Sequence, residues 1–294
     1  MSNTPSALNA LPDGITHETN AHGRSFLCIK HSNVSARIAF TGAHIVHCQP
    51  SGEDDLLWMS PADPQQPGTA LRGGVPICWP WFGGDRLGAP AHGVARTADW
   101  QLDGVTVEHQ QVRVNMSIPP ETLTQLLPEE AWAVSVEFVL GHSLTINLTT
   151  RNIGSEPQLL SQALHTYLPV THIADATLEG LHSVRYLDKL TGEDRAGDTP
   201  ALTIDGEVDR VYYQYAGPVK LRCTGMKDRV ITRNGCSALV VWNPGADKGA
   251  TLSQFPTDGH QHMLCIEAAN AGPDKRLLAP WESHMLSTTI GYEP

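Results

Sequence analysis

Hydrophobic and polar residues alternate with a period of two along much of the chain. Clear examples are segments 34–40, 105–114 and 144–150. Successive side chains of a β-strand point to opposite faces, so this alternation predicts strands that are buried on one side. Turn-forming residues follow at short intervals, for example at 152–157 and 243–245. Strands joined by turns and loops predict an all-β fold, a large antiparallel β-sandwich.

A single segment has the features of a helix. Proline and glutamate open the stretch 119–127, and Leu123, Leu126 and Leu127 are spaced to share one face. We expect this helix to be short and peripheral. Strand patterning continues on both sides of every candidate break, without an internal repeat or a long linker. The sequence therefore predicts one domain over residues 1–294, of which about 1–15 form a loose N-terminal segment.

The balance of charges excludes some classes of partner. The 294 residues include 20 Lys and Arg against 31 Asp and Glu, a formal net charge of −11. Such a protein repels polyphosphate backbones and anionic lipid, so we expect neither nucleic acid nor membrane as a partner. An anionic small molecule would need a few arginines gathered at one place.

The N-terminus and the cysteines bear on location. The first residues lack the basic and apolar regions of an export signal, and no run of about 18 apolar residues occurs. The six cysteines form no C-x-x-C pair, and several lie in strand-like runs, as buried free thiols do. We therefore expect a cytoplasmic protein, and a monomer.

One stretch is too rich in Gly, Pro and aromatic residues to be a regular strand. It covers 71–85 and continues over 89–96. Glycines allow close approach of the backbone, and apolar walls with a few converging polar groups are typical of a ligand pocket. The same composition equally suits a packed loop that closes one end of the sandwich. Its candidate polar groups are Arg72, Arg86, His92 and Arg96.

Three further residues could carry chemistry. His165 lies among apolar neighbours in a predicted strand, where a histidine is more often a core residue than a catalyst. Glu267 interrupts an apolar strand near its end, so its carboxylate must border a cleft or pair with a cation. Asp209 could bind a ligand or form a weak surface ion pair with Arg210.

Taken in order, these segments resemble the aldose 1-epimerase superfamily and, within it, the glucose-6-phosphate 1-epimerase branch. The match extends over roughly residues 30 to 290, and the Arg-Gly-Gly and His-Gly-x-Ala-Arg motifs are specific to the branch. The family fold is an elongated β-sandwich of the galactose mutarotase type, in agreement with the periodicity. The motifs are Arg72-Gly-Gly-Val-Pro76, Trp79-Pro-Trp-Phe-Gly83, Pro90-Ala-His-Gly-Val-Ala-Arg96, His165-Thr-Tyr167, Asp209-Arg-Val-Tyr212, Val241-Trp-Asn-Pro244 and Cys265-Ile-Glu267.

The resemblance implies a role for each candidate residue. His165 and Glu267 would be the catalytic acid and base, and Asp209 would fix sugar hydroxyls. Arg72 and Arg96 would hold a phosphate, with His92 close to the sugar. The substrate would be a hexose 6-phosphate whose α and β anomers are interconverted. Proton transfer to the ring oxygen and from the C1 hydroxyl opens the ring, so no cofactor and no metal is expected.

Other hypotheses compete with this one. His260 and His262 would place two imidazoles on one face of a strand, but no third ligand lies at a matching spacing, which disfavours a metal site. A non-catalytic sugar-binding sandwich would explain the aromatic loop without needing His165 or Glu267. A mutarotase for unphosphorylated aldoses would have no need for Arg72 and Arg96 together.

Overall fold

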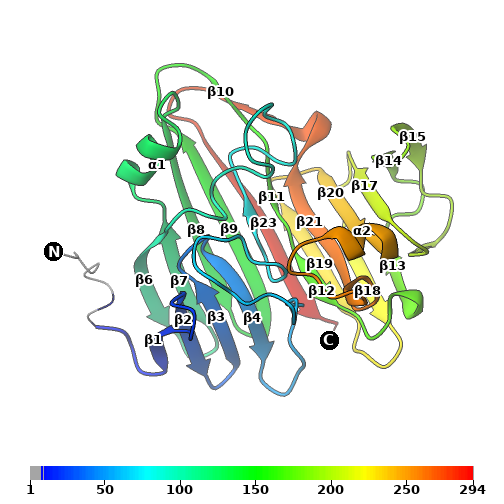
Figure 1. Ribbon diagram of the computed structural model, residues 1–294, viewed down its shortest axis with the longest axis horizontal. Helices are drawn as coiled ribbons and strands as arrows, with labels where there is room; N and C mark the ends of the chain where they lie inside the picture. Colours follow the sequence, from blue (N-terminus) through cyan, green and yellow to red (C-terminus); the bar gives the residue numbers. More distant parts are fainter. Residues whose placement is uncertain (1–7, 9, 294) are drawn as a thin grey trace.

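Antiparallel β-sheets dominate the fold, as predicted (Figure 1). The computed structural model describes residues 8 and 10–293. The first sheet is a meander of four strands in sequence order: β1 (Ile15–Thr19), β2 (Ser25–His31), β3 (Val34–Ala39) and β4 (His44–Pro50). Of the N-terminal segment expected to be loose, residues 1–7 and 9 lie outside the described part of the chain.

A nine-stranded sheet forms one large layer. Its order is not the order of the sequence, because the C-terminal strand β23 lies between β19 and β9. The strands in spatial order are β16 (Ala201–Thr203), β13 (Ala176–Glu179), β18 (Val219–Cys223), β19 (Arg229–Asn234), β23 (Ser283–Tyr292), β9 (Ser143–Asn152), β8 (Trp132–Leu140), β7 (Val112–Ser117) and β6 (Gln101–Val107).

An eight-stranded sheet forms a second layer. Its order is β15 (Glu193–Ala196), β14 (Arg185–Asp188), β17 (Val208–Tyr212), β20 (Ala238–Asn243), β21 (Met263–Asn270), β11 (Gln162–Leu164) and β5 (Ile77–Cys78), and β12 (Tyr167–Pro169) also pairs with β21. A small two-stranded sheet joins β10 (Gln158–Leu160) to β22 (Arg276–Leu278).

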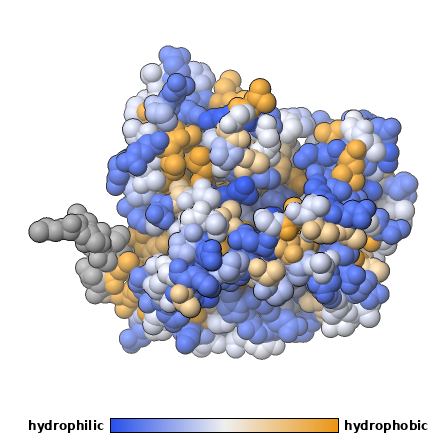
Figure 2. Space-filling model, viewed as in Figure 1, coloured by the Kyte–Doolittle hydropathy of each residue, from blue (hydrophilic) through white to orange (hydrophobic). Residues whose placement is uncertain are grey.

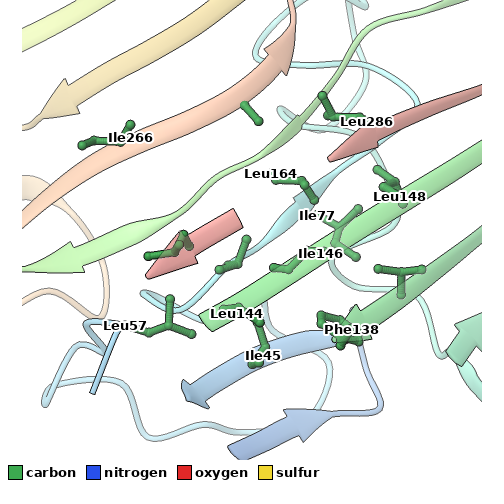
Figure 3. Close-up of a cluster of buried hydrophobic side chains, with 14 of the residues drawn as sticks. Ile45, Leu57, Ile77, Phe138, Leu144, Ile146, Leu148, Leu164, Ile266 and Leu286 are labelled. Atoms are coloured by element: carbon green, nitrogen blue, oxygen red, sulfur yellow. The ribbon is translucent and has the colours of Figure 1, made fainter. Parts of the chain in front are cut away.

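The main hydrophobic core lies where the sheets face one another. Strand β9 alternates buried and half-buried residues and points Leu144, Ile146 and Leu148 inward. Figure 3 draws these side chains together with Ile266 of β21 and Leu164 of β11, from the second layer. Burial of each such side chain contributes roughly 1.5–3 kcal/mol. Both faces of β21 are buried, and its second face carries the site described below.

The helices of the described residues are short. Helix α1 (Pro120–Leu126) confirms the predicted helix, but it buries Leu123 while Leu126 is 39% exposed, so the expected apolar face is narrower. Helix α2 (Gly245–Thr251) was not predicted, because it contains two glycines and lacks apolar periodicity. In Figure 1 it lies in front of β20 and β21. Three 3₁₀ turns are η2 (Ile173–Asp175), η3 (Gly259–Gln261) and η4 (Gly272–Asp274).

One predicted strand was wrong. The alternation over 105–114 belongs to two strands, β6 and β7, which form a hairpin that turns at residues 108–111. The apolar positions change from odd numbers (Val105, Val107) to even numbers (Val112, Val114) across the run Glu108-His-Gln-Gln111, which marks the turn. Because polar residues are common to exposed strands and to turns, the prediction of a single strand overlooked this change of phase.

Candidate active site

His165 and Glu267 face each other across neighbouring strands. Strands β11 and β12 pair with β21 in one register, in which Leu164 is opposite Ala268 and Tyr167 is opposite Cys265. His165 is therefore opposite Glu267, and opposite residues of an antiparallel pair project from the same face. The His165 Nε2 atom is 3.3 Å from Glu267 Oε1. Two sequence candidates more than 100 residues apart thus form one pair.

The surroundings of this pair are largely apolar. The Glu267 side chain is 1% exposed, and that of His165 is 13% exposed. The imidazole stacks on Tyr167, with ring centroids 4.9 Å apart, and meets Trp242 edge-on at 5.9 Å. Glu267 lies in the middle of β21 rather than near its end as expected. It borders a pocket, which explains how a carboxyl group interrupts an apolar strand.

Both members of the pair are shifted toward their uncharged forms. Burial, followed by the electrostatic influence of the neighbouring His92 and Arg72, holds the pKa of His165 well below its usual range. Burial, followed by the negative charge of Asp209, raises the pKa of Glu267 well above its usual range. Neither His165 Nδ1 nor Glu267 Oε2 has a hydrogen-bond partner within the described part of the chain. Strongly shifted groups with free polar atoms are typical of functional sites.

Residues 70–72 line the pocket, and the two glycines that follow Arg72 fix the path of this loop. The Arg72 N–H donates to Asp63 Oδ2 at 2.6 Å, and His44 Nε2 donates to the Gly73 carbonyl at 2.7 Å. Gly74 adopts φ +58°, and a Cβ there would lie 2.2 Å from the Ile45 carbonyl oxygen. Glycine is required because the loop passes so close to β4. The Arg72 Nε atom is buried without a partner among the described residues.

His92 and Arg96 also line the pocket. His92 has a left-handed backbone, φ 66°, and its ring lies 5.7 Å from the His165 ring. Burial and the positive charge of Arg96 lower the pKa of His92 to about 4, so this imidazole is neutral near pH 7. The Arg96 guanidinium donates to the Ala91 carbonyl at 2.8 Å. A Cβ at the neighbouring Gly93 would lie 2.0 Å from the Trp79 carbonyl oxygen, which fixes glycine there.

Asp209, on β17, lies on the side of Glu267 away from His165. Its Oδ2 lies 3.4 Å from Lys189 Nζ. The alternative of an Asp209–Arg210 ion pair is wrong, because these consecutive residues of β17 point to opposite faces and Arg210 lies over the Tyr186 ring, 4.7 Å from its centroid.

The structure gathers all six predicted site residues around one pocket of about 260 Å³. Arg86, the fourth polar group of the loop, does not line it. Its guanidinium pairs with Glu130 at 2.6 Å and lies over the Trp81 ring. The six residues are Arg72, His92, Arg96, His165, Asp209 and Glu267.

Sequence reasoning missed several lining residues. Tyr167 and Trp242 belong to quoted motifs, and the position of Tyr167 two residues from His165 could have placed it on the same face. Trp242 lies opposite Asp209, a pairing that only the folded sheet defines. Lys189 and Lys248 had no signal, since they lie in a turn and in the unexpected helix α2. Lys248 pairs with Glu207 at 2.7 Å.

The hypothesis of a metal site gains no support from the described residues. None of their His, Cys, Asp and Glu side chains form a group of three or more that could hold a metal ion. His262 Nδ1 instead donates to the Thr171 carbonyl at 3.0 Å. All six cysteines are buried free thiols, as expected. No helix in the described ranges is long and apolar enough to cross a membrane.

Figure 2 shows the molecular face in front of β20 and β21, where hydrophilic residues dominate and hydrophobic ones gather in small groups. A β-sandwich with a buried His–Glu pair in a polar-rimmed pocket is suited to acid–base chemistry on a small polar molecule.

Comparison with known proteins defines this class further. The sequence profile described as Aldose 1-epimerase matches residues 25–291. The chain belongs to the aldose 1-epimerase family and is an epimerase.

Individual relatives agree with this assignment. A protein of Escherichia coli named "Putative glucose-6-phosphate 1-epimerase" is 30% identical over 267 residues, 88% of this chain and 87% of that protein. One of the same name from Cenchrus ciliaris is 32% identical over 255 residues, 81% of this chain and 75% of that protein. The crystal structure of "a putative mutarotase (YeaD)" from Salmonella typhimurium superimposes with a TM-score of 0.88 at 26% identity, covering 96% of this chain and 94% of that one.

Proposed function

We propose that this epimerase interconverts the α and β anomers of a hexose 6-phosphate, with glucose 6-phosphate as the simplest substrate. The observation that carries the proposal is the 3.3 Å approach of His165 and Glu267 in a pocket that also contains two arginines. The pair supplies an acid and a base, and the arginines supply the cations for a phosphate. The names of the curated relatives support the same substrate class.

The reaction needs two proton transfers. Glu267 takes the proton of the C1 hydroxyl while His165 donates to the ring oxygen O5, and the C1–O5 bond breaks. The resulting aldehyde rotates about the C1–C2 bond and closes through its other face with the roles reversed. Each positioned group contributes about 10²–10⁴-fold. No residue is consumed and no redox step occurs.

The substrate's phosphate also favours the protonation state that ring opening requires, in which His165 is the acid and Glu267 is the base. In the empty pocket burial and the nearby cations keep His165 neutral. A phosphate dianion at Arg72 and Arg96 offsets their positive charge and so raises the pKa of His165. The single proton of the pair then moves more readily from Glu267 to His165, which makes the histidine an acid and the glutamate a base. Substrate binding thus favours the ionised form of the pair, with His165 protonated and Glu267 deprotonated.

Recognition of the phosphate rests on geometry as well as charge. Guanidinium groups match phosphate oxygens with two parallel hydrogen bonds. Arg72 and Arg96 both line the pocket and act on the charge of His165, and the Arg72 Nε donor has no partner among the described residues. Asp209 lies on the Glu267 side, where its carboxylate can accept from a sugar hydroxyl.

The proposal is tested by exchange NMR spectroscopy on the two anomers of glucose 6-phosphate and of glucose. We expect the protein to accelerate anomer exchange, with kcat/KM higher for the phosphate ester. Equal rates for the two sugars would favour a mutarotase for unphosphorylated aldoses. Binding without acceleration would favour a non-catalytic sugar-binding protein.

A further inference from the structure

A second groove opens beside the proposed catalytic pocket. It has a volume of about 550 Å³ and shares the lining residues Phe82, Gly83 and Lys189 with the pocket, so the two spaces are adjacent. Leu187 and Val211 form its floor, and Ala271–Pro273 form one side. The anomer exchange of a simple hexose phosphate uses none of this space.

The register of the sheet places the groove relative to the His–Glu pair. Glu267 is opposite Val240 on β20, Val240 is opposite Val211 on β17, and Val211 is opposite Leu187 on β14. These residues form one row on one face, with His165 at its other end. Neighbouring strands lie about 4.8 Å apart, so the groove begins two strands beyond Glu267, on the side away from His165.

The proposed chemistry fixes the direction of the sugar along this row. O5 must lie at His165 and the C1 hydroxyl at Glu267. Since O5 is bonded to C5 and C1 is bonded to C2, C5 and its C6 phosphate lie on the His165 side, whereas C2 lies on the Glu267 side. A substituent on C2 therefore points along the row, over Val240 and toward Val211.

The charges around the pair agree with this direction. Arg72 and Arg96 act on the imidazole of His165, where the phosphate would lie. Asp209 and Lys189 act on the carboxyl of Glu267, where C2 would lie. Lys189 is also the cation at the junction of the two spaces. The C2 substituent thus meets an ammonium group and a carboxylate before it reaches the groove.

The groove itself suits an alkyl chain. Leu187 is 39% exposed although it lies within a strand, and its neighbours on the floor and side are Val211, Ala271 and Pro273. The acidic residues along it already have partners: Asp85 pairs with Lys275 at 3.0 Å and Asp194 with Arg185 at 2.9 Å. A second sugar ring would find few free groups for its hydroxyls, whereas an apolar chain would be buried.

We infer that this groove is a binding site for the acyl group of a 2-acylamino-2-deoxyhexose 6-phosphate. The inference rests on the proposed function and extends its substrate class. Lys189 can donate to the amide carbonyl, and Asp209 can accept from the amide N–H. An acetyl group reaches the space over Val240, and a longer acyl chain reaches Val211 and Leu187.

The test compares anomer exchange of three sugars by NMR: glucose 6-phosphate, N-acetylglucosamine 6-phosphate and N-butyrylglucosamine 6-phosphate. We expect all three to be exchanged by the wild-type protein, with kcat/KM at least as high for the butyryl sugar as for the acetyl sugar. Leu187→Trp fills the groove, and we expect it to lower kcat/KM for the butyryl sugar by about ten- to a hundredfold, with glucose 6-phosphate within about twofold.

Two controls keep the result interpretable. Leu277→Trp places the same side chain at a 66% exposed position outside the groove and should leave all three rates unchanged. Leu187→Gln removes apolar surface without filling the groove. It should lower kcat/KM for N-butyrylglucosamine 6-phosphate alone. Exchange of glucose 6-phosphate without exchange of the acylated sugars overturns this inference and leaves the proposed function standing. Equal losses on all sugars in Leu187→Trp also overturn it. Absence of glucose 6-phosphate exchange overturns both.

Discussion

Replacement of the two pocket arginines separates phosphate recognition from support of the loop. Arg72→Ala and Arg96→Ala each remove a guanidinium group that lines the pocket beside His165. A charge-assisted hydrogen bond to a phosphate is worth about 1.5–3 kcal/mol. Since 1.36 kcal/mol is a factor of ten, each variant should lower kcat/KM for glucose 6-phosphate by roughly ten- to a hundredfold. The rate with neutral glucose should hardly change.

Arg86→Ala is the matched control, because Arg86 belongs to the same loop but points away from the pocket. Its guanidinium is 38% exposed and pairs with Glu130, so its loss should cost at most about 1 kcal/mol of stability. The assay is anomer exchange on both sugars, together with thermal melting of all three variants. An unchanged preference for the phosphate ester in Arg72→Ala and Arg96→Ala would refute phosphate binding by this pair. So would an equal loss of that preference in Arg86→Ala.

Three other perturbations test the surroundings of the site. Burial lowers the pKa of His44 from 6.5 to about 4, so unfolding takes up a proton between these values. The contribution of neutral His44 to the free energy of unfolding is complete above about pH 6.5 and is lost as the pH falls toward 4. In thermal melts, His44→Gln should therefore lose stability less steeply than the wild type as the pH falls, by up to about 1.4 kcal/mol per pH unit. A parallel pH dependence in both proteins would contradict it. Gly93→Ala should destabilise by more than about 2 kcal/mol, because its Cβ would overlap the Trp79 carbonyl. The control Gly52→Ala, with open space around residue 52, should lower the free energy of unfolding by only about 1 kcal/mol. Equal decreases in Tm for the two variants would argue against the close approach of Gly93 to Trp79. EDTA and phenanthroline should leave exchange unchanged, whereas activity lost to them and restored by zinc would reinstate a metal.

The sandwich was predictable because period-two alternation is a local property of the chain. In β9 the alternation extends from Ser143 to Thr149, with Leu144, Ile146 and Leu148 as the apolar positions. The hairpin of β6 and β7 was missed although the apolar positions shift from odd to even numbers across its turn, because polar residues occur in exposed strands as well as in turns. Helix α2 was missed because its seven residues include two glycines and show no apolar periodicity.

The site was predictable in its residue types but not in its geometry. His165 and Glu267 could be selected individually, whereas their opposition depends on the register of β21 with β11 and β12, which only the folded sheet defines. By residue type alone, Arg86 was as good a candidate for the phosphate as Arg96, and its packing against Trp81 and Glu130 removes it from the pocket. Lys189 entered the pocket through the pairing of β14 with β17, for which no local pattern exists.

The central claim is that Glu267 exchanges a proton with the C1 hydroxyl. Glu267→Gln keeps the shape of this 1% exposed side chain but removes its ability to take a proton. The decisive measurement is the rate of glucose 6-phosphate anomer exchange by NMR for the wild type and for the folded variant at equal concentration. We predict a decrease of about 10²–10⁴-fold in Glu267→Gln. A folded variant that exchanges the anomers at nearly the wild-type rate would contradict the account.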